Sequence, residues 1–180
     1  ADYHWRLTTP DRLGQAGIEK IGVGALLGLY DWSYDLMATA AHVSYLRRRY
    51  WRTQISVSFP RLRPAAGGFT PRSPVSDVQL LQIICAWRIF DPQLDLTIST
   101  RERAQLRDLL LPVGITAISA GSSTKPGGYA SGDREELAQW TVNDGRSVDE
   151  VVAAMQALGL EAVFHSASQN ALGRAAQAAG

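Results

Sequence analysis

Arginine, serine, threonine and glycine residues that could do chemistry gather directly after short apolar segments of this chain. An arginine grips a carboxylate at two points, a hydroxyl orients neutral polar groups, and a glycine lets a ligand approach the backbone. The set comprises Gly22, Gly24, Gly28, Arg61, Arg63, Ser99, Thr100, Arg101, Ser119, Gly121 and Ser122. Such a combination predicts a site for a small amino acid or nucleoside rather than for a macromolecule.

Structural explanations exist for the same residues. Arg61 and Arg63 could be salt-bridge partners within the fold, and Ser99 with Glu102 could form only a helix capping box. The glycines at 22 and 24 do not complete a dinucleotide fingerprint, because no further glycine stands at the required spacing. The prediction of a site therefore depends on the shared position of these residues at the ends of expected strands.

Other chemistry has little support in the sequence. His4, His42 and His165 are scattered, so we expect no metal site. A nucleophile elbow or a catalytic triad is not evident either, which argues against a hydrolase. The residues alone point to no particular catalytic group.

The elements that must position this site alternate between helix and strand. Periodicity and capping signals predict helices over residues 9–16, 33–50, 76–90 and 99–112, and strands over residues 18–29, 55–59, 94–98 and 115–118. Ser99 with Glu102 would cap the fourth helix, and the apolar run in the first strand indicates burial on both faces. About four units of this kind predict parallel β/α crossovers.

A four-stranded sheet of this type needs neighbours at its edges, because unpaired backbone groups would otherwise meet water. The series begins with a helix, so we expect the missing strands to precede it and to close a TIM-type (β/α) barrel. The predicted fold class is therefore α/β, the second half of such a barrel over residues 1–132 with a small C-terminal helical cap over residues 133–180. A small independent open sheet is the alternative. Ser147 with Glu150 predicts a helix in the cap.

The composition of the chain indicates which partners and which cellular compartment to expect. The formal net charge is +1, so the bulk charge does not favour a nucleic acid or an anionic membrane surface. The single cysteine, Cys85, lies in an apolar run and is expected to be a small buried hydrophobe, which favours a reduced cytoplasmic setting. The chain starts at Ala1 without an initiator methionine, and we expect the start to be truncated.

Several blocks of the chain closely resemble a known family. These blocks are Tyr3-His4-Trp5-Arg6-Leu7-Thr8-Thr9-Pro10-Asp11-Arg12, residues 16–28, Ser56-Val57-Ser58-Phe59-Pro60-Arg61-Leu62-Arg63-Pro64, Ser99-Thr100-Arg101-Glu102, Ile118-Ser119-Ala120-Gly121-Ser122, Pro126-Gly127-Gly128-Tyr129 and Leu172-Gly173-Arg174. In this order they resemble the tyrosine-cleaving 2-iminoacetate synthases of the radical S-adenosylmethionine superfamily. The stretch from about residue 133 is similar to the biotin and thiamin synthesis associated domain.

The resemblance implies a β/α-barrel lyase that uses S-adenosylmethionine and a [4Fe-4S] cluster to take hydrogen from tyrosine. The Cα–Cβ bond then breaks to give dehydroglycine, used for the thiazole of thiamine, and p-cresol. By the same resemblance Gly22, Gly24 and Gly28 would bind the cofactor. The predicted substrate residues are Arg61, Arg63, Ser99, Arg101, Ser119 and Ser122.

The family binds its cluster through a C-x₃-C-x₂-C motif, and this chain holds only one cysteine. The resemblance therefore implies that the chain is inactive alone and that its partners are an N-terminal barrel half, tyrosine and thiazole synthase.

Two alternatives stay open. The hydrogenase-maturation tyrosine lyase shares several blocks, including one like Leu29-Tyr30-Asp31, but it uses cysteines of a C-terminal extension for a second cluster. This chain has no cysteine after Cys85. A non-catalytic half-barrel that binds a metabolite or a partner subunit is the other alternative.

Overall fold

The computed structural model describes residues 2–63, 70–122 and 142–164, and within them it contains one parallel sheet. Its strands lie in the order of the sequence: β1 (Lys20–Gly24), β2 (Gln54–Ser58), β3 (Asp95–Ile98) and β4 (Ala117–Ile118). Helices α3 (Trp32–Arg49), α4 (Asp77–Phe90) and α5 (Ala104–Leu110) connect them. This confirms the predicted α/β class, because consecutive parallel strands joined by helices are the repeat of a β/α barrel.

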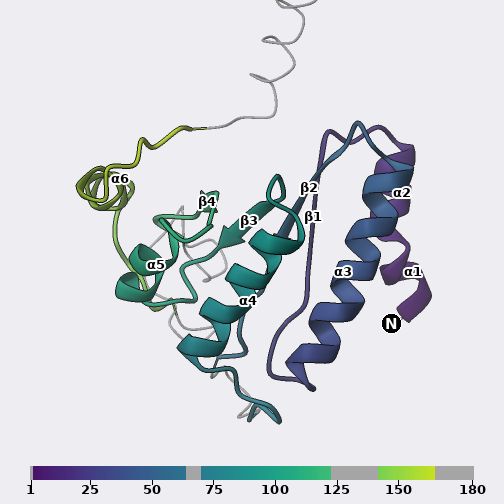
Figure 1. Ribbon diagram of the computed structural model, residues 1–180, viewed down its shortest axis with the longest axis horizontal. Helices are drawn as coiled ribbons and strands as arrows, with labels where there is room; N and C mark the ends of the chain where they lie inside the picture. The colour runs from purple at the N-terminus through teal and green to yellow at the C-terminus, as the bar shows by residue number, and fades with distance from the viewer. Residues whose placement is uncertain (1, 64–69, 123–141, 165–180) are drawn as a thin grey trace, which may run out of the picture.

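The remaining described helices lie at the two ends of this sheet. Helices α1 (Tyr3–Leu7) and α2 (Thr9–Gln15) lie with α3 beside β1, whereas α6 (Val148–Ala157) lies beyond β4 and α5 (Figure 1). Met155 and Leu160 pack against the core, so the segment around α6 is attached to the sheet. The predicted domain boundary at residue 132 lies outside the described residues.

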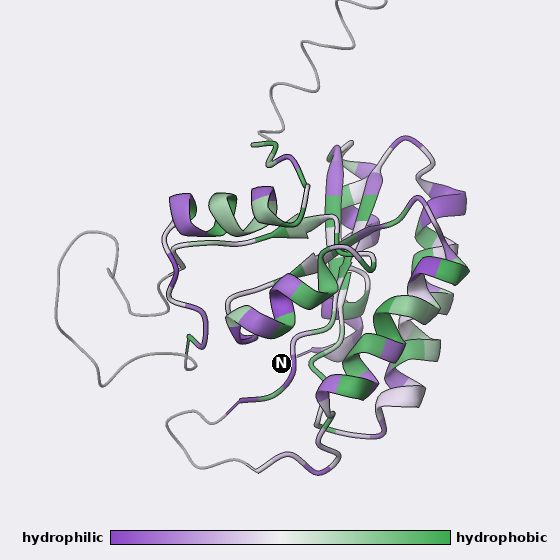
Figure 2. Ribbon diagram, turned by 60° about the vertical axis from the view of Figure 1, so that its left-hand side comes forward, coloured by the Kyte–Doolittle hydropathy of each residue, from purple (hydrophilic) through white to green (hydrophobic). Residues whose placement is uncertain are grey.

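Local signals account for the long helices. Ser76 and Gln79 form a capping box at the start of α4, and Ser147 with Glu150 forms the predicted one at α6. At α3, the side chain of Asp31 accepts a hydrogen bond from the Ser33 amide at 2.9 Å. Figure 2 shows hydrophilic and hydrophobic residues mixed along the helices, as expected where one side of a helix faces the core and the other faces solvent.

The two faces of the sheet differ in character. One row, Ile21, Ile55, Val57, Leu96 and Ile98, is buried against apolar residues of α3, α4 and α5. The opposite face is small and polar: in one register line Gly24 pairs with Ser58, Ser58 with Thr97, and Thr97 with Ala117. Helices α3, α4 and α5 thus cover one face, and the other carries hydroxyls and glycines.

Several expectations from the sequence need correction. The first strand is only five residues long and alternates between buried and exposed positions, so it is not buried on both faces in this chain. No capping box forms at residue 99; α5 begins at Ala104, and Glu102 is turned toward Arg61 instead.

Cys85 is exposed on α4, because Ile83, Ile84 and Trp87 occupy the inward side of that helix. Helix α1 was not predicted. Among the described helices, none combines the length and the apolar character that a membrane span requires.

Candidate functional site

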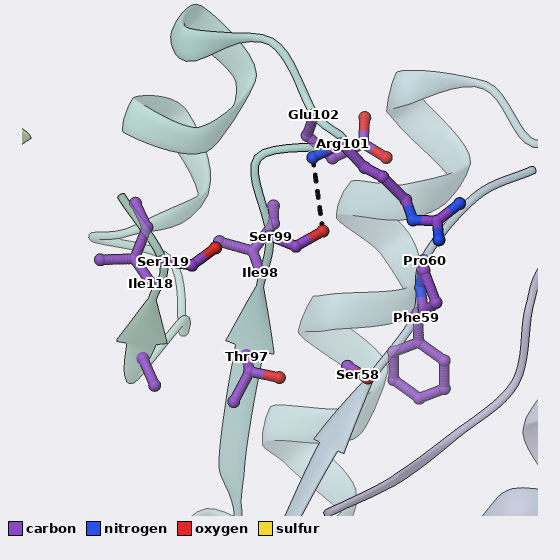
Figure 3. A pocket seen from close by; sticks show the side chains of 11 residues that line it. Ser58, Phe59, Pro60, Thr97, Ile98, Ser99, Arg101, Glu102, Ile118 and Ser119 are labelled. Carbon is purple, nitrogen blue, oxygen red and sulfur yellow. Dashed lines mark hydrogen bonds between the residues drawn. The ribbon is translucent and has the colours of Figure 1, made fainter. Parts of the chain in front are cut away.

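A pocket of about 480 Å³ opens at the carboxyl ends of β2, β3 and β4, on the polar face of the sheet. It is lined by Ser58, Phe59, Pro60, Thr97, Ile98, Ser99, Arg101, Glu102, Ala117, Ile118 and Ser119 (Figure 3). Its size suits a small molecule. The structure therefore brings the predicted Ser99, Arg101 and Ser119 together, while the predicted Arg61, Arg63 and Ser122 do not line this pocket.

The serine hydroxyls of the pocket differ in their hydrogen bonding. Ser99 Oγ accepts a long hydrogen bond of 3.4 Å from the backbone amide of Arg101 (Figure 3). Ser119 Oγ is buried and has no hydrogen-bond partner within the described part of the chain. Because a buried hydroxyl without a partner is costly, a ligand that bonds Ser119 would gain free energy there.

Arg61 lies beside the pocket in a buried ion pair with Glu102. Arg61 is 6% exposed and Glu102 is 2% exposed. The Arg61 Nε donates to Glu102 Oε1 at 3.0 Å, and its Nη1 donates to the Val75 carbonyl at 2.9 Å and lies 2.8 Å from Asp77 Oδ1. Burial alone would lower the pKa of Arg61, but hydrogen bonds and charges from Glu102 and Asp77 outweigh it and raise the pKa. The salt bridge left open by the sequence is thus formed, and substrate binding by Arg61 stays a prediction.

Of the three predicted arginines, Arg101 lines the pocket, and Arg63 lies close enough to add to the effect of burial in lowering the pKa of Arg101. Arg63 also donates to Glu102, its side chain is 27% exposed, and its Nε is buried without a partner in the described residues. Arg101 lines the pocket, and although burial lowers the pKa of Arg101, a guanidinium stays charged at neutral pH. Arg61 and Arg63 both pair with Glu102, and Arg61 shares Asp77 with Arg103. Three guanidiniums thus face two carboxylates, and this excess of positive charge favours an anion such as a carboxylate.

The predicted cofactor glycines lie elsewhere. Gly22 and Gly24 line a second pocket of about 420 Å³ with residues of α1, α2 and α3, and Gly28 lines neither pocket. A Cβ on Gly24 would stand 2.1 Å from the Ser58 carbonyl oxygen, and Gly28 has a φ of 113°, so the backbone itself requires both. A Cβ on Gly22 would meet only Ser56 Oγ, at 3.4 Å. Gly24 and Gly28 thus have a structural reason to be glycine, and cofactor binding by the three glycines stays a prediction.

A [4Fe-4S] cluster does not fit the described residues. They hold no group of three or more histidine, cysteine, aspartate or glutamate side chains placed for a metal ion. The whole chain contains a single cysteine, whereas such clusters are held by several cysteine thiolates.

A second buried ion pair, which the sequence analysis missed, supports the pocket from outside. Arg107 of α5 is fully buried and donates to Asp144 and to the backbone carbonyl of Ser119. Burial raises the pKa of Asp144, but hydrogen bonds from Arg146 and the charges of Arg107 and Arg146 outweigh it and hold the pKa below its ordinary value. No short-range pattern signals this pair, since its partners are 37 residues apart.

The fold and the pocket define a segment of a β/α barrel with a small-ligand site at its strand ends. Residues 58–161 match the model of the Biotin and Thiamin Synthesis associated domain, and the chain belongs to that family. The matched residues extend from β2 to beyond α6, on both sides of the predicted boundary at residue 132, which stays a prediction.

Curated relatives and solved structures agree with this assignment. The 2-iminoacetate synthases of Salmonella typhimurium and Escherichia coli are each 48% identical over 177 residues, 98% of this chain and 46% of the relative. The chain therefore spans about half the length of the curated relatives it matches. The predicted family resemblance is confirmed.

Two structures of HydG, a maturase of the [FeFe]-hydrogenase, are each 36% identical to the chain. The first superposes with a TM-score of 0.78 and covers 88% of this chain and 35% of its own. The second, from Carboxydothermus hydrogenoformans, has a TM-score of 0.80 and covers 92% of this chain and 38% of its own. A match to little more than a third of a larger chain confirms that the fold is a partial barrel.

Proposed function

We propose that this chain is the part of a radical S-adenosylmethionine tyrosine lyase that cleaves tyrosine to 2-iminoacetate and p-cresol for the thiazole of thiamine. The observation that carries the proposal is the 48% identity to two 2-iminoacetate synthases over 98% of the chain. A pocket with cationic and hydroxyl groups at the strand ends supports it, because tyrosine brings a carboxylate, an amine and a phenol.

In this proposal the described residues bind and orient the substrate. Arg101 of the pocket wall and Arg63, which lies beside it outside the lining, receive the carboxylate in charge-assisted hydrogen bonds, and Glu102 holds the Arg63 guanidinium in place. The unpartnered hydroxyl of Ser119 bonds a polar group of tyrosine, and Ser99 stands beside it. S-Adenosylmethionine and a [4Fe-4S] cluster, when bound, supply the radical that removes hydrogen from the substrate.

The partners follow from what the chain lacks. Its single cysteine leaves the cluster ligands to an N-terminal barrel half, so the 180 residues alone are expected to be inactive. Thiazole synthase is proposed as a further partner that receives the product, and the cytoplasm as the compartment. Gly22 is proposed to face the cofactor, because a side chain there would meet no protein atom closer than 3.4 Å.

The test uses the full-length protein that contains this chain, reconstituted with iron and sulfide under anaerobic conditions. Tyrosine, S-adenosylmethionine and dithionite are added, and p-cresol is measured by liquid chromatography. We expect p-cresol to form with the full-length protein and not with the 180 residues alone. A loaded full-length protein that produces no p-cresol would contradict the proposal, and binding of tyrosine without turnover would favour the non-catalytic half-barrel.

Hydrogenase maturation is the second candidate, favoured by the TM-score of 0.80 to HydG. Identity is lower in this comparison, at 36%, and no cysteine follows Cys85 in this chain. Phe164-His165-Ser166-Ala167-Ser168 stands where that lyase is expected to carry its cysteine pair. Serine hydroxyls stay protonated and are poor ligands for iron–sulfur units, so we propose that the product is released as dehydroglycine.

A further inference from the structure

We infer that residues 143–146, here called the strap, position Arg101 and Ser119 for substrate binding, with Asn143 as the residue that fixes the turn carrying Arg101. The inference rests on the proposed function, because it takes tyrosine as the ligand of the pocket. The strap itself lies outside the pocket lining and was not among the predicted site residues.

The strap lies across the turns that follow β3 and β4. The backbone amides of Asn143 and Asp144 both donate to the Thr100 carbonyl, at 2.9 and 3.2 Å. Asn143 Nδ2 donates to the Arg101 carbonyl at 2.7 Å. On the side of β4, the Gly121 amide donates to the Arg146 carbonyl at 3.3 Å. Two successive carbonyls of the β3–α5 turn are therefore satisfied by the strap.

Buried charge holds the strap in place. Asp144 accepts from the fully buried Arg107, which also donates to the Ser119 carbonyl. Arg146 donates to both oxygens of Asp108 on α5, at 3.0 and 2.9 Å, and to Asp144 at 2.7 Å. One ion-pair network thus joins α5, the strap and the end of β4, so a shift of the strap would move the pocket wall.

Within the turn that carries Arg101, the side chain of Glu102 is anchored by Arg61 and Arg63, whereas the backbone on either side of it has weak local support. Helix α5 begins without a side-chain cap, and the Ser99 hydroxyl accepts from the Arg101 amide only at 3.4 Å. The short bond from Asn143 is thus a strong local restraint on this turn. Because a guanidinium binds a carboxylate well only in a narrow range of geometries, loosening the turn weakens the substrate contact before it unfolds the protein.

Asn143→Ala in the full-length protein tests this positioning role. We expect a rise of roughly three- to tenfold in KM for tyrosine, the loss that follows from one hydrogen bond, with kcat and S-adenosylmethionine binding nearly unchanged. Asn143→Asp keeps the side-chain size but removes the donor, so it should raise KM at least as much. Ser147→Ala is the matched control, because it removes one hydrogen bond of the α6 capping box four residues further on and should leave KM unchanged.

Two results would overturn the inference: wild-type KM in both Asn143 variants, or an equal rise in Ser147→Ala. Amide hydrogen exchange across residues 99–103 keeps the test separate from the proposed function. Exchange there should be faster in Asn143→Ala than in Ser147→Ala even if no tyrosine cleavage is found. Equal exchange in the two variants would contradict the positioning role, whereas missing p-cresol with the wild type would count only against the proposed function.

Discussion

Replacing Glu102 by glutamine is expected to destabilise the protein strongly, because this carboxylate forms a buried ion pair with Arg61. Glu102 is 2% exposed and Arg61 is 6% exposed. Removing one partner of a buried ion pair costs about 3–5 kcal/mol, since the other charge is left uncompensated. Asp77 still lies 2.8 Å from Arg61 Nη1, and glutamine keeps one oxygen as an acceptor. The free energy of unfolding should therefore fall by about 3 kcal/mol, at the lower end of that range.

Thermal unfolding of the full-length protein, followed by circular dichroism, measures this loss. In a protein about twice the length of this chain, a change of about 3 kcal/mol should lower Tm by about 3–6 °C. Glu161→Gln is the matched control, since it makes the same chemical change at an exposed position and should alter stability by less than about 0.5 kcal/mol. The double variant Arg61→Met with Glu102→Leu removes both charges and should recover much of the loss. A Glu102→Gln Tm within about 2 °C of wild type would refute the assignment of a buried structural pair.

Four further predictions address the ion pairs, the glycines, the arginines and the sheet edges. The pKa of Asp144 is lowered in the fold, so its carboxylate stabilises the folded state above about pH 4, and this contribution is lost as the pH falls further. The difference between the urea midpoints of wild type and Asp144→Asn should therefore be smaller at pH 3 than at pH 6. Gly22→Ala should leave Tm unchanged and weaken S-adenosylmethionine binding. Gly24→Ala should lower the free energy of unfolding by about 2–3 kcal/mol, because its Cβ would stand 2.1 Å from a carbonyl oxygen. Lysine in place of Arg63 or Arg101 should weaken tyrosine binding, measured by calorimetry, by about 1.5–3 kcal/mol, with little effect on cofactor binding. Unaltered tyrosine affinity in both lysine variants would indicate that the two arginines have a structural role. Strands β1 and β4 are the edges of the sheet in the part of the chain that the structure describes, so the isolated 180 residues should self-associate. A compact, cooperatively melting monomer in size-exclusion chromatography would contradict this.

Short-range patterns predicted most of the fold. The capping boxes at Ser76 and Ser147 locate α4 and α6, and alternating apolar residues locate β2 and β3. Each of these signals acts within a few residues, so the neighbouring sequence contains the information that decides the structure. Cys85 marks the limit of this reasoning: its apolar neighbours suggested burial, but the helical period turns it away from the core.

Long-range pairing accounts for what the sequence did not predict. Ser99 and Glu102 have the spacing of a capping box, yet Glu102 pairs with Arg61, 41 residues earlier in the chain. A buried guanidinium gains more from this carboxylate than a helix end would, since an unpaired buried charge is more costly than an uncapped turn. The strap around Asn143 has no local signal at all, and only the fold brings it to the end of β3.

Product analysis of the anaerobically reconstituted full-length protein tests the central claim most directly. Tyrosine labelled with ¹³C at Cα and at the carboxyl carbon is supplied with S-adenosylmethionine and dithionite, and p-cresol, glyoxylate, ammonia and carbon monoxide are measured together. A 2-iminoacetate-forming lyase should release p-cresol with labelled glyoxylate and ammonia, the hydrolysis products of dehydroglycine, and no carbon monoxide. Labelled carbon monoxide that accumulates in step with p-cresol, without any added cluster protein, would contradict the assignment to thiazole synthesis.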